Sequence, residues 1–256
     1  MDGRQLNAAV RRFDRFCEDY SVRNGLQRAI ARELVSKIDF YPRDFCVQKI
    51  LDLGAGEGAV FRQIAQNSGQ IFGGGCRLNY GQFFALDLSP SMLNMHPSSD
   101  KIVKICADFN SESDMAKLAQ FAPIDLVISS CALQWAHNLD FALGTISKLA
   151  KHAAFALFTD GTFAALREFS GRGTTLLPID EVKETLSKFY DAKIYTKNFR
   201  VDFRDHRELF SYIRKSGIGG GEKTLTIAET KKLINSYPYN YLTYETLFAT
   251  AKSKSL

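Results

Sequence analysis

The sequence predicts an α/β fold in which a largely parallel sheet is covered by helices on both faces. Short apolar runs alternate with amphipathic segments along most of the 256 residues, and strands that alternate with helices form parallel sheets. One apolar run, at Lys49–Gly58 (KILDLGAGEG), ends in an acid and continues into closely spaced glycines. A second run, Phe83–Leu88, also ends beside an acid. Both patterns are typical of parallel strands whose carboxyl ends bind a nucleoside.

The predicted elements follow one another in a regular order after an N-terminal helical segment. Residues 4–38 have apolar side chains at three- and four-residue steps, which indicates helices, and Pro42 marks the break before the sheet. We expect strands at Lys49–Leu53, Gln82–Leu88, Ile102–Cys106, Asp125–Ser129 and Ala153–Thr159. We expect helices between them at Ala59–Gln66, Pro90–Met95, Ser113–Phe121 and Asp140–Lys151.

The alternation changes after Thr159. Residues 160–190 contain three glycines and a proline before a predicted helix at Ile179–Phe189, and we interpret 160–190 as a substrate cap inserted after the fifth strand. Residues 1–256 are treated as one domain with an N-terminal helical segment at 1–41. The remaining expected elements are strands at Ala192–Phe203 and Thr243–Lys252 and helices at His206–Lys215 and Ile227–Ser236.

Composition is that of an ordinary globular protein, with 45% hydrophobic and 24% charged residues. No apolar run approaches the roughly 20 residues that span a bilayer, and the polar start predicts no signal peptide. The five cysteines have no CxxC spacing, so we expect a cytoplasmic location and no metal site. Nucleic-acid binding is disfavoured because no dense basic stripe with interleaved aromatic residues is found. The net charge of +5 is modest and is most simply explained by solvated surface; the alternative is an acidic partner attracted by electrostatic steering.

The glycine-rich turn at Gly54–Gly58 favours S-adenosylmethionine over a dinucleotide. Its third glycine comes one residue too early for the GxGxxG pattern of dinucleotide sites. Asp52 and Glu57 flank the turn, and their carboxylates would repel a diphosphate but attract an ammonium and a sulfonium. A nicotinamide dehydrogenase is therefore disfavoured.

Two further acids follow the second and third predicted strands. Asp87 is placed to bind a ribose. Asp108 follows the next strand, where it would bind an adenine amino group while Phe109 covers the ring. Because the carboxyl ends of parallel strands meet at one edge, these residues and the glycine turn are expected to form one site.

Three successive motifs resemble those of Rossmann-like S-adenosylmethionine-dependent methyltransferases: Leu51–Gly58 (LDLGAGEG), Leu86–Leu93 (LDLSPSML) and Ala107-Asp108. The resemblance implies a seven-stranded sheet whose last strand is antiparallel. It also implies S-adenosyl-L-methionine as the cofactor, released as S-adenosyl-L-homocysteine. The cofactor contacts that it implies are Gln27, Asp52, Gly54, Ala55, Gly56, Asp87, Leu88, Met92, Asp108, Phe109 and Ser129.

A narrower resemblance covers most of the chain. Ser130–Trp135 (SCALQW) and Lys215–Gly219 (KSGIG) are similar to segments of the malonyl-acyl-carrier-protein O-methyltransferases of biotin synthesis, as is the pairing of Tyr20 with Gln27. The resemblance implies methylation of the free carboxylate of a malonyl group on acyl carrier protein, with Tyr20 and Trp135 orienting the acceptor. Asn24 and the extra glycines at Gly73–Gly75 depart from the family pattern.

Methylation of a carboxylate needs no strong general base, because the acceptor is already ionised at neutral pH. The protein must align the reacting atoms and exclude water, so we expect no catalytic histidine, nucleophile or metal. An arginine is expected to hold the acceptor's carboxylate, and the candidates are Arg167, Arg172 and Arg204. Two alternatives stay open: an O-methyltransferase for a free polycarboxylate such as trans-aconitate, and a protein that binds S-adenosylmethionine without catalysis.

Overall fold

The computed structural model describes residues 25–39, 47–66, 80–216 and 227–256. Tyr20, the Gly73–Gly75 loop and most of the predicted N-terminal helical segment lie outside the described residues.

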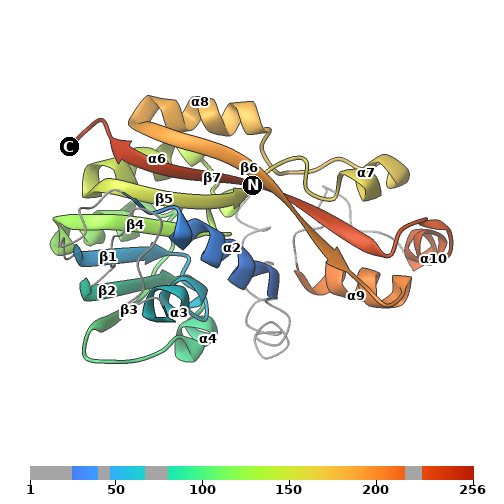
Figure 1. The fold of residues 1–256 in the computed structure, drawn as a ribbon, viewed down its shortest axis with the longest axis horizontal. Coiled ribbons are helices and arrows are strands. Elements are labelled where there is room, and N and C mark those ends of the chain that lie inside the picture. Colours follow the sequence, from blue (N-terminus) through green and yellow to red (C-terminus); the bar gives the residue numbers. More distant parts are fainter. Residues whose placement is uncertain (1–24, 40–46, 67–79, 217–226) are drawn as a thin grey trace.

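One seven-stranded sheet organises the described chain, in the order β3-β2-β1-β4-β5-β7-β6 (Figure 1). The first five strands are parallel, and β7 runs antiparallel to both β5 and β6. This arrangement confirms the predicted fold class, including the antiparallel last strand. The strands are β1 (Val47–Leu53), β2 (Tyr80–Asp87), β3 (Ile102–Cys106), β4 (Ile124–Ser130), β5 (Ala150–Phe158), β6 (Tyr190–Asp202) and β7 (Tyr241–Ser253).

Helices cover both faces of the sheet, as its alternating side chains require. Ile50 and Phe83 belong to a core that α2 and α3 cover, whereas Leu51 and Phe84 belong to a second core under α5, α6 and α8. No helix of the described ranges has the length and apolar character needed to cross a membrane. The helices are α2 (Gly25–Ser36), α3 (Ala59–Gln66), α4 (Pro90–Met95), α5 (Glu112–Lys117), α6 (Leu139–Leu149), α7 (Ala164–Ser170), α8 (Ile179–Phe189), α9 (His206–Ser216) and α10 (Ile227–Ser236).

One boundary error concerns the junction of α6 and β5. The sequence predicts a helix as far as Lys151, but α6 ends at Leu149, and Ala150 already pairs with Ile124 of β4. No glycine or proline marks this junction, so the sequence has no stop signal there. The ladder to β4 decides where the strand begins.

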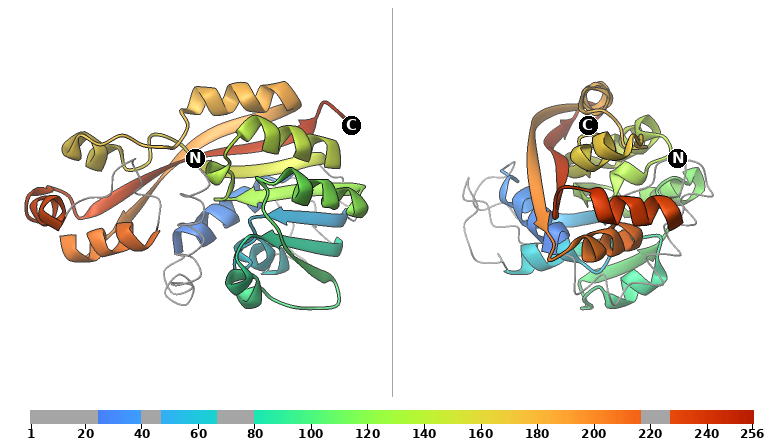
Figure 2. Two further views of the ribbon diagram at one scale, coloured as in Figure 1. Left: turned by 180° about the vertical axis from the view of Figure 1, so that it is seen from behind. Right: turned by 90° about the vertical axis from the view of Figure 1, so that its right-hand side faces the viewer.

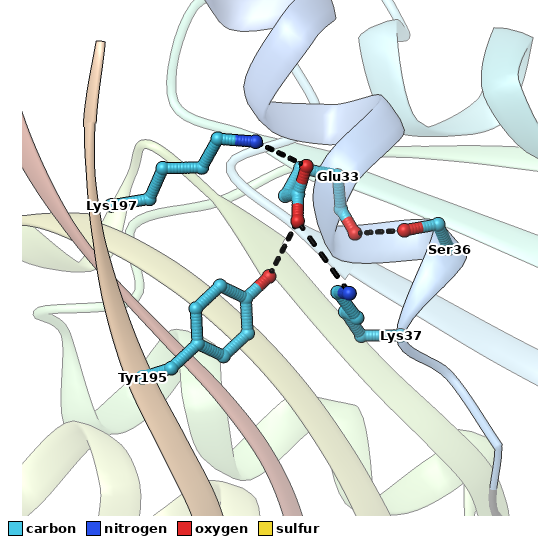
Figure 3. A network of polar contacts seen from close by, with 5 residues as sticks. All are labelled: Glu33, Ser36, Lys37, Tyr195 and Lys197. Carbon is cyan, nitrogen blue, oxygen red and sulfur yellow. Dashed lines mark hydrogen bonds and ion pairs between the residues drawn. The ribbon is translucent and has the colours of Figure 1, made fainter.

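Ionic contacts join α2 to the edge strand β6 (Figure 3). Glu33 of α2 accepts hydrogen bonds from the Tyr195 hydroxyl at 3.1 Å and from Lys197 Nζ at 2.7 Å. The hydrogen bond from Lys197 is the main cause that lowers the pKa of Glu33. At the opposite end of α2, Arg28 approaches Glu57 of the glycine turn at 3.4 Å. The first turn of α2 therefore lies beside the carboxyl end of β1.

The paired strands β6 and β7 extend beyond the carboxyl ends of the other strands (Figures 1 and 2). Phe158 of β5 pairs with Thr246, so residues 241–245 of β7 pair only with β6. Helices α7, α9 and α10 gather around this extension, and we call these three helices with residues 198–205 and 237–245 the distal lobe. Its buried side chains include Leu209, Phe210, Leu233, Tyr237 and Tyr244.

The structure divides the segment that the sequence predicts as a cap. Helix α7 belongs to the distal lobe, where it contacts β7. Helix α8 instead packs on α6 and β6, along one face of the sheet. A substrate-capping role for residues 160–190 stays a prediction, and the geometry restricts it to the part that precedes α8.

Candidate active site

The turn after β1 brings backbone N–H groups to the end of β2. Gly54 and Ala55 both donate to the Leu86 carbonyl at 2.8 Å, and Gly56 donates to Asp87 Oδ2 at 2.8 Å. Gly54 and Gly56 have φ angles of +78° and +54°, in the left-handed region that glycine adopts most readily. A Cβ on Gly54 would overlap the Cβ of Ala132. Glycine at position 54 therefore allows the turn to pack against the segment after β4.

Asp87 connects this turn to the helix that follows β2. Its Oδ1 accepts the N–H of Ser89 at 2.9 Å, and Ser89 Oγ caps α4 by accepting from Met92 N at 3.1 Å. The Met92 side chain lies beside Gly56, since a Cβ built there would be 3.4 Å from Met92 Cε. The predicted cofactor residues Gly56, Asp87 and Met92 are thus brought together.

Asp108 follows β3 and is oriented by its neighbours. Its Oδ1 accepts from Asn110 N at 2.8 Å and from Asn110 Nδ2 at 3.1 Å. Asn110 Oδ1 in turn accepts from His137 N at 2.7 Å, which joins the end of β3 to the segment after β4. Phe109 packs in the second core with 9% of its surface exposed. Both hydrogen bonds from Asn110 go to Oδ1, and the described residues donate none to Oδ2 of Asp108.

Asp52 is the most unusual group at this edge of the sheet. It is 1% exposed, and neither carboxylate oxygen has a hydrogen-bond partner among the described residues. Burial raises the pKa of Asp52 well above its usual value, and the charge of Asp87 raises it further. A buried carboxylate without a partner is costly in its charged form. Asp52 therefore favours either a proton or a cationic ligand.

Two buried amide oxygens also lack partners in the described part of the chain: Oε1 of Gln27 and Oε1 of Gln134. Gln134 donates its Nε2 to the Cys131 carbonyl at 2.6 Å, which fixes the orientation of its amide. Cys131 itself has a φ of +58°, a conformation that non-glycine residues rarely adopt. Both glutamines thus offer acceptors to a ligand that donates N–H groups.

Sequence reasoning missed Gln134. The residue lies within the SCALQW motif, where it is the one amide among apolar neighbours. The presence of an amide in this otherwise apolar stretch could have indicated a ligand contact, but the motif was used only to assign a role to Trp135. Trp135 itself ends the 3₁₀ turn Leu133–Trp135 and packs against the second core.

The remaining predicted residues occupy different environments. Ser129 is fully buried and donates its hydroxyl to the Leu53 carbonyl at 2.8 Å, which joins β4 to β1. Arg167 of α7 is half-buried, and its guanidinium donates to the Thr162 carbonyl in the turn after β5. Arg204 lies in the distal lobe with its side chain 84% exposed. Arg172 follows α7, where its N–H donates to the Arg167 carbonyl at 3.2 Å.

Within the described ranges, no group of three His, Cys, Asp or Glu side chains is placed to hold a metal ion. The donors and acceptors at the carboxyl edge are instead backbone N–H groups, carboxylates and amide oxygens. Such a set suits an organic ligand that has hydroxyls and an ammonium.

Comparison with known proteins agrees with this geometry. Residues 51–158 match the family model described as a methyltransferase domain. A malonyl-[acyl-carrier protein] O-methyltransferase of Chlorobium phaeovibrioides is 22% identical over 214 residues, covering 82% of this chain and 78% of the relative. The protein of the same name from Methylovorus is 28% identical over 190 residues, covering 72% of this chain and 59% of the relative.

Solved structures support the fold. An S-adenosylmethionine-dependent methyltransferase of Anabaena variabilis superposes with a TM-score of 0.54 at 12% identity, covering 96% of this chain and 95% of that one. The YcgJ protein of Bacillus subtilis gives a TM-score of 0.58 at 11% identity, covering 87% and 97%. The sheet order, the glycine turn and the family match lead to one conclusion. Residues 51–158 match a methyltransferase domain, and the described chain has the fold of the solved S-adenosylmethionine-dependent methyltransferases.

Proposed function

We propose that this methyltransferase esterifies the free carboxylate of a malonyl group held as a thioester on acyl carrier protein, an early step of biotin (pimeloyl) synthesis. The acceptor is proposed from relatives, because four proteins named malonyl-[acyl-carrier protein] O-methyltransferase match at 22–28% identity. The observation in this chain that carries the cofactor assignment is the buried Asp52 carboxylate, which has no partner among the described residues.

The cofactor's ammonium fits the acceptors around the glycine turn. An ammonium offers three N–H donors and a positive charge, and Asp52 supplies a buried negative charge for it. Gln27 Oε1, in the first turn of α2, and Gln134 Oε1 supply two neutral acceptors. Binding there would satisfy buried oxygens that otherwise remain unpaired, which is the reason to place the methionine end of the cofactor at this point.

The nucleoside end fits the acids after β2 and β3. A carboxylate has about four acceptor positions, and Asp87, which accepts the N–H groups of Gly56 and Ser89, is assigned to a ribose hydroxyl. Asp108, held by Asn110, is assigned to the adenine amino group. Met92, beside Gly56, and Phe109 supply apolar surface for the ring.

Catalysis by this chain consists of positioning. When bound, S-adenosylmethionine supplies the methyl group, which its sulfonium activates for displacement in line with the attacking oxygen. The acceptor carboxylate is already ionised, so no side chain needs to remove a proton. Trp135, directly after the Gln134 acceptor, is assigned to the surface that aligns the acceptor and excludes water. Tyr20 remains a candidate for the same role.

Arg167 is the preferred candidate among the three arginines for binding the carboxylate of the malonyl acceptor. Its guanidinium lies in the turn after β5, where Asp160 and Glu245 act on it electrostatically, and it uses one N–H group on the Thr162 carbonyl. A guanidinium has about five N–H donors, so donors other than the one on Thr162 can bind the oxygens of the acceptor. Arg204 is a weaker candidate because it is largely exposed and pairs with Asp205 at 3.6 Å.

The test offers labelled S-adenosylmethionine with malonyl carrier protein, malonyl-CoA and trans-aconitate side by side. We expect a base-labile methyl ester on the malonyl group, formed fastest on the carrier protein. A clear preference for trans-aconitate would instead establish the free-polycarboxylate alternative. Tight cofactor binding with no ester on any acceptor that has a free carboxylate would favour the non-catalytic alternative.

A further inference from the structure

Exposed aromatic rings gather on the distal lobe. Apart from Leu256 near the chain end, Phe169 and Tyr239 are the exposed large hydrophobic side chains of the described residues, at 43% and 42%. Phe169 meets Tyr237 at 5.6 Å between ring centroids, Tyr237 meets Tyr239 at 5.6 Å, and Tyr239 meets Tyr241 at 5.1 Å. These four rings form a continuous series from α7 to the start of β7, which we call the aromatic series.

A cation lies at one end of the aromatic series. The guanidinium of Arg200 is 3.9 Å from the centroid of the Tyr241 ring, within the range of a cation–π contact. Phe203 donates its N–H to the Asn240 carbonyl at 2.8 Å, which joins the segment after β6, where Arg204 follows, to the segment just before β7. Rings and arginines are the residue types enriched where protein interfaces are strongest.

Among the side chains that the structure describes on the lobe, exposed charge is mainly positive. The exposed acids in this set are Glu168 and Asp202, and Asp202 already pairs with Arg200 at 2.7 Å. Two further carboxylates are occupied at the start of α9: Asp205 accepts Glu208 N at 2.8 Å, and Glu208 accepts Arg204 N at 2.9 Å. The exposed basic side chains in the same described set are Arg200, Arg204, Arg207, Lys231 and Lys232.

We propose that the exposed rings of the aromatic series, Phe169 and Tyr239, and these basic side chains of the distal lobe form the docking surface for the acidic acyl carrier protein. This inference rests on the proposed function, which makes a carrier-bound malonyl group the acceptor. The lobe projects past the carboxyl ends of β1–β5 (Figures 1 and 2), the edge where the candidate site lies. A carrier bound to the lobe would therefore deliver its flexible arm to that edge, while the positive side chains attract its acidic surface.

The experiment compares two substrates that share the malonyl thioester and differ in the protein. Malonyl carrier protein has the acidic surface, whereas malonyl-pantetheine has the arm without protein or phosphate. The test variants are R207E/K232E, which reverses two charges of the lobe, and Tyr239→Ser, which removes an exposed ring. The matched control is K148E/K183E, which reverses two exposed charges on α6 and α8 and changes the net charge equally.

Both lobe variants should lower kcat/KM for malonyl carrier protein by about tenfold, and leave the rate with malonyl-pantetheine unchanged. The control should affect neither substrate. An unchanged kcat/KM for the carrier protein, or an equal loss with both substrates, would contradict the proposed docking surface. Methylation of malonyl carrier protein by the wild type would still support the proposed function in that case. Absence of methylation by the wild type with either substrate would instead reject the proposed function, and the docking surface with it.

Discussion

Asp87 accepts the N–H of Gly56 at 2.8 Å with one carboxylate oxygen and the N–H of Ser89 at 2.9 Å with the other. One side chain thereby fixes the glycine turn after β1 relative to the helix cap after β2. The same carboxylate is the proposed ribose ligand. Its structural bonds hold the group in place before any ligand arrives, so that less order has to be created on binding.

Replacement of Asp87 by Ala should remove both the ribose contact and this link. Loss of hydrogen bonds to a charged acceptor costs roughly 1.5–3 kcal/mol, so calorimetry should show S-adenosylhomocysteine binding weakened by about ten- to a hundredfold. The melting temperature should fall as well, because Gly56 and Ser89 lose their acceptor. Normal affinity in a folded Asp87→Ala variant would mean that the ribose binds elsewhere.

The two glycines of the turn should respond differently to alanine. At Gly54 the new Cβ would overlap Ala132, whereas at Gly56 it would meet only the flexible end of Met92 at 3.4 Å. Both positions have positive φ, which costs about 1 kcal/mol or more for alanine. Chemical denaturation should therefore show a loss of about 3 kcal/mol or more for Gly54→Ala and a smaller loss for Gly56→Ala. Equal losses of unfolding free energy would show that the segment of Ala132 can move away from the new Cβ at little cost.

Gln134→Met should weaken binding of the methionine end of the cofactor and leave binding of its nucleoside end unchanged. Methionine has a similar shape but no amide oxygen, so binding of S-adenosylhomocysteine should weaken by about tenfold or more. Binding of methylthioadenosine, which lacks the ammonium and carboxylate, should be unaffected. Equal weakening of both ligands would indicate a general disturbance of the turn held by the Gln134–Cys131 contact. Unchanged binding of both would remove Gln134 from the cofactor site.

Glu33→Gln should weaken the attachment of α2 to β6. The pKa of Glu33 is lowered in the folded protein, chiefly by Lys197, from a usual value of 4.5. Its contribution to stability is therefore present above that value and is lost as the pH falls. At neutral pH the variant should lose about 0.5–1 kcal/mol of unfolding free energy, and the difference should shrink in acid. The exposed Glu184→Gln on α8 is the control, and a pH-independent difference would contradict the ionic origin.

The carboxyl-edge residues could be predicted because parallel strands end together. Asp52, Asp87 and the glycine turn each follow an apolar run, and the topology of the sheet then brings them to one place. The sequence pattern could not show that both oxygens of Asp52 would be left without partners in the described chain. That property depends on how closely its neighbours pack, which no spacing of residues encodes.

The distal lobe could be predicted only in parts. Its two helices after β6 and the two long strands were expected, but the point where β5 stops pairing with β7 depends on register. Helix α7 was not predicted, because its N-cap is Phe163, which has no capping side chain and adopts a left-handed φ of +60° that the sequence does not indicate. Ser129 was expected to contact the cofactor, and its observed bond to Leu53 is a contact that its position at a strand end does not reveal.

The charge state of Asp52 tests the central claim most directly, because burial keeps its pKa well above the usual value when no cation is bound. A bound ammonium favours the ionised carboxylate, so the proton must leave when the cofactor binds, and affinity should rise with pH up to the raised pKa. Calorimetry of S-adenosylhomocysteine binding at about pH 6, in buffers of different ionisation enthalpy, should show proton release by the wild type and none by Asp52→Asn. Binding without proton release, or equal release by Asp52→Asn, would contradict the assignment of Asp52 to the cofactor's ammonium.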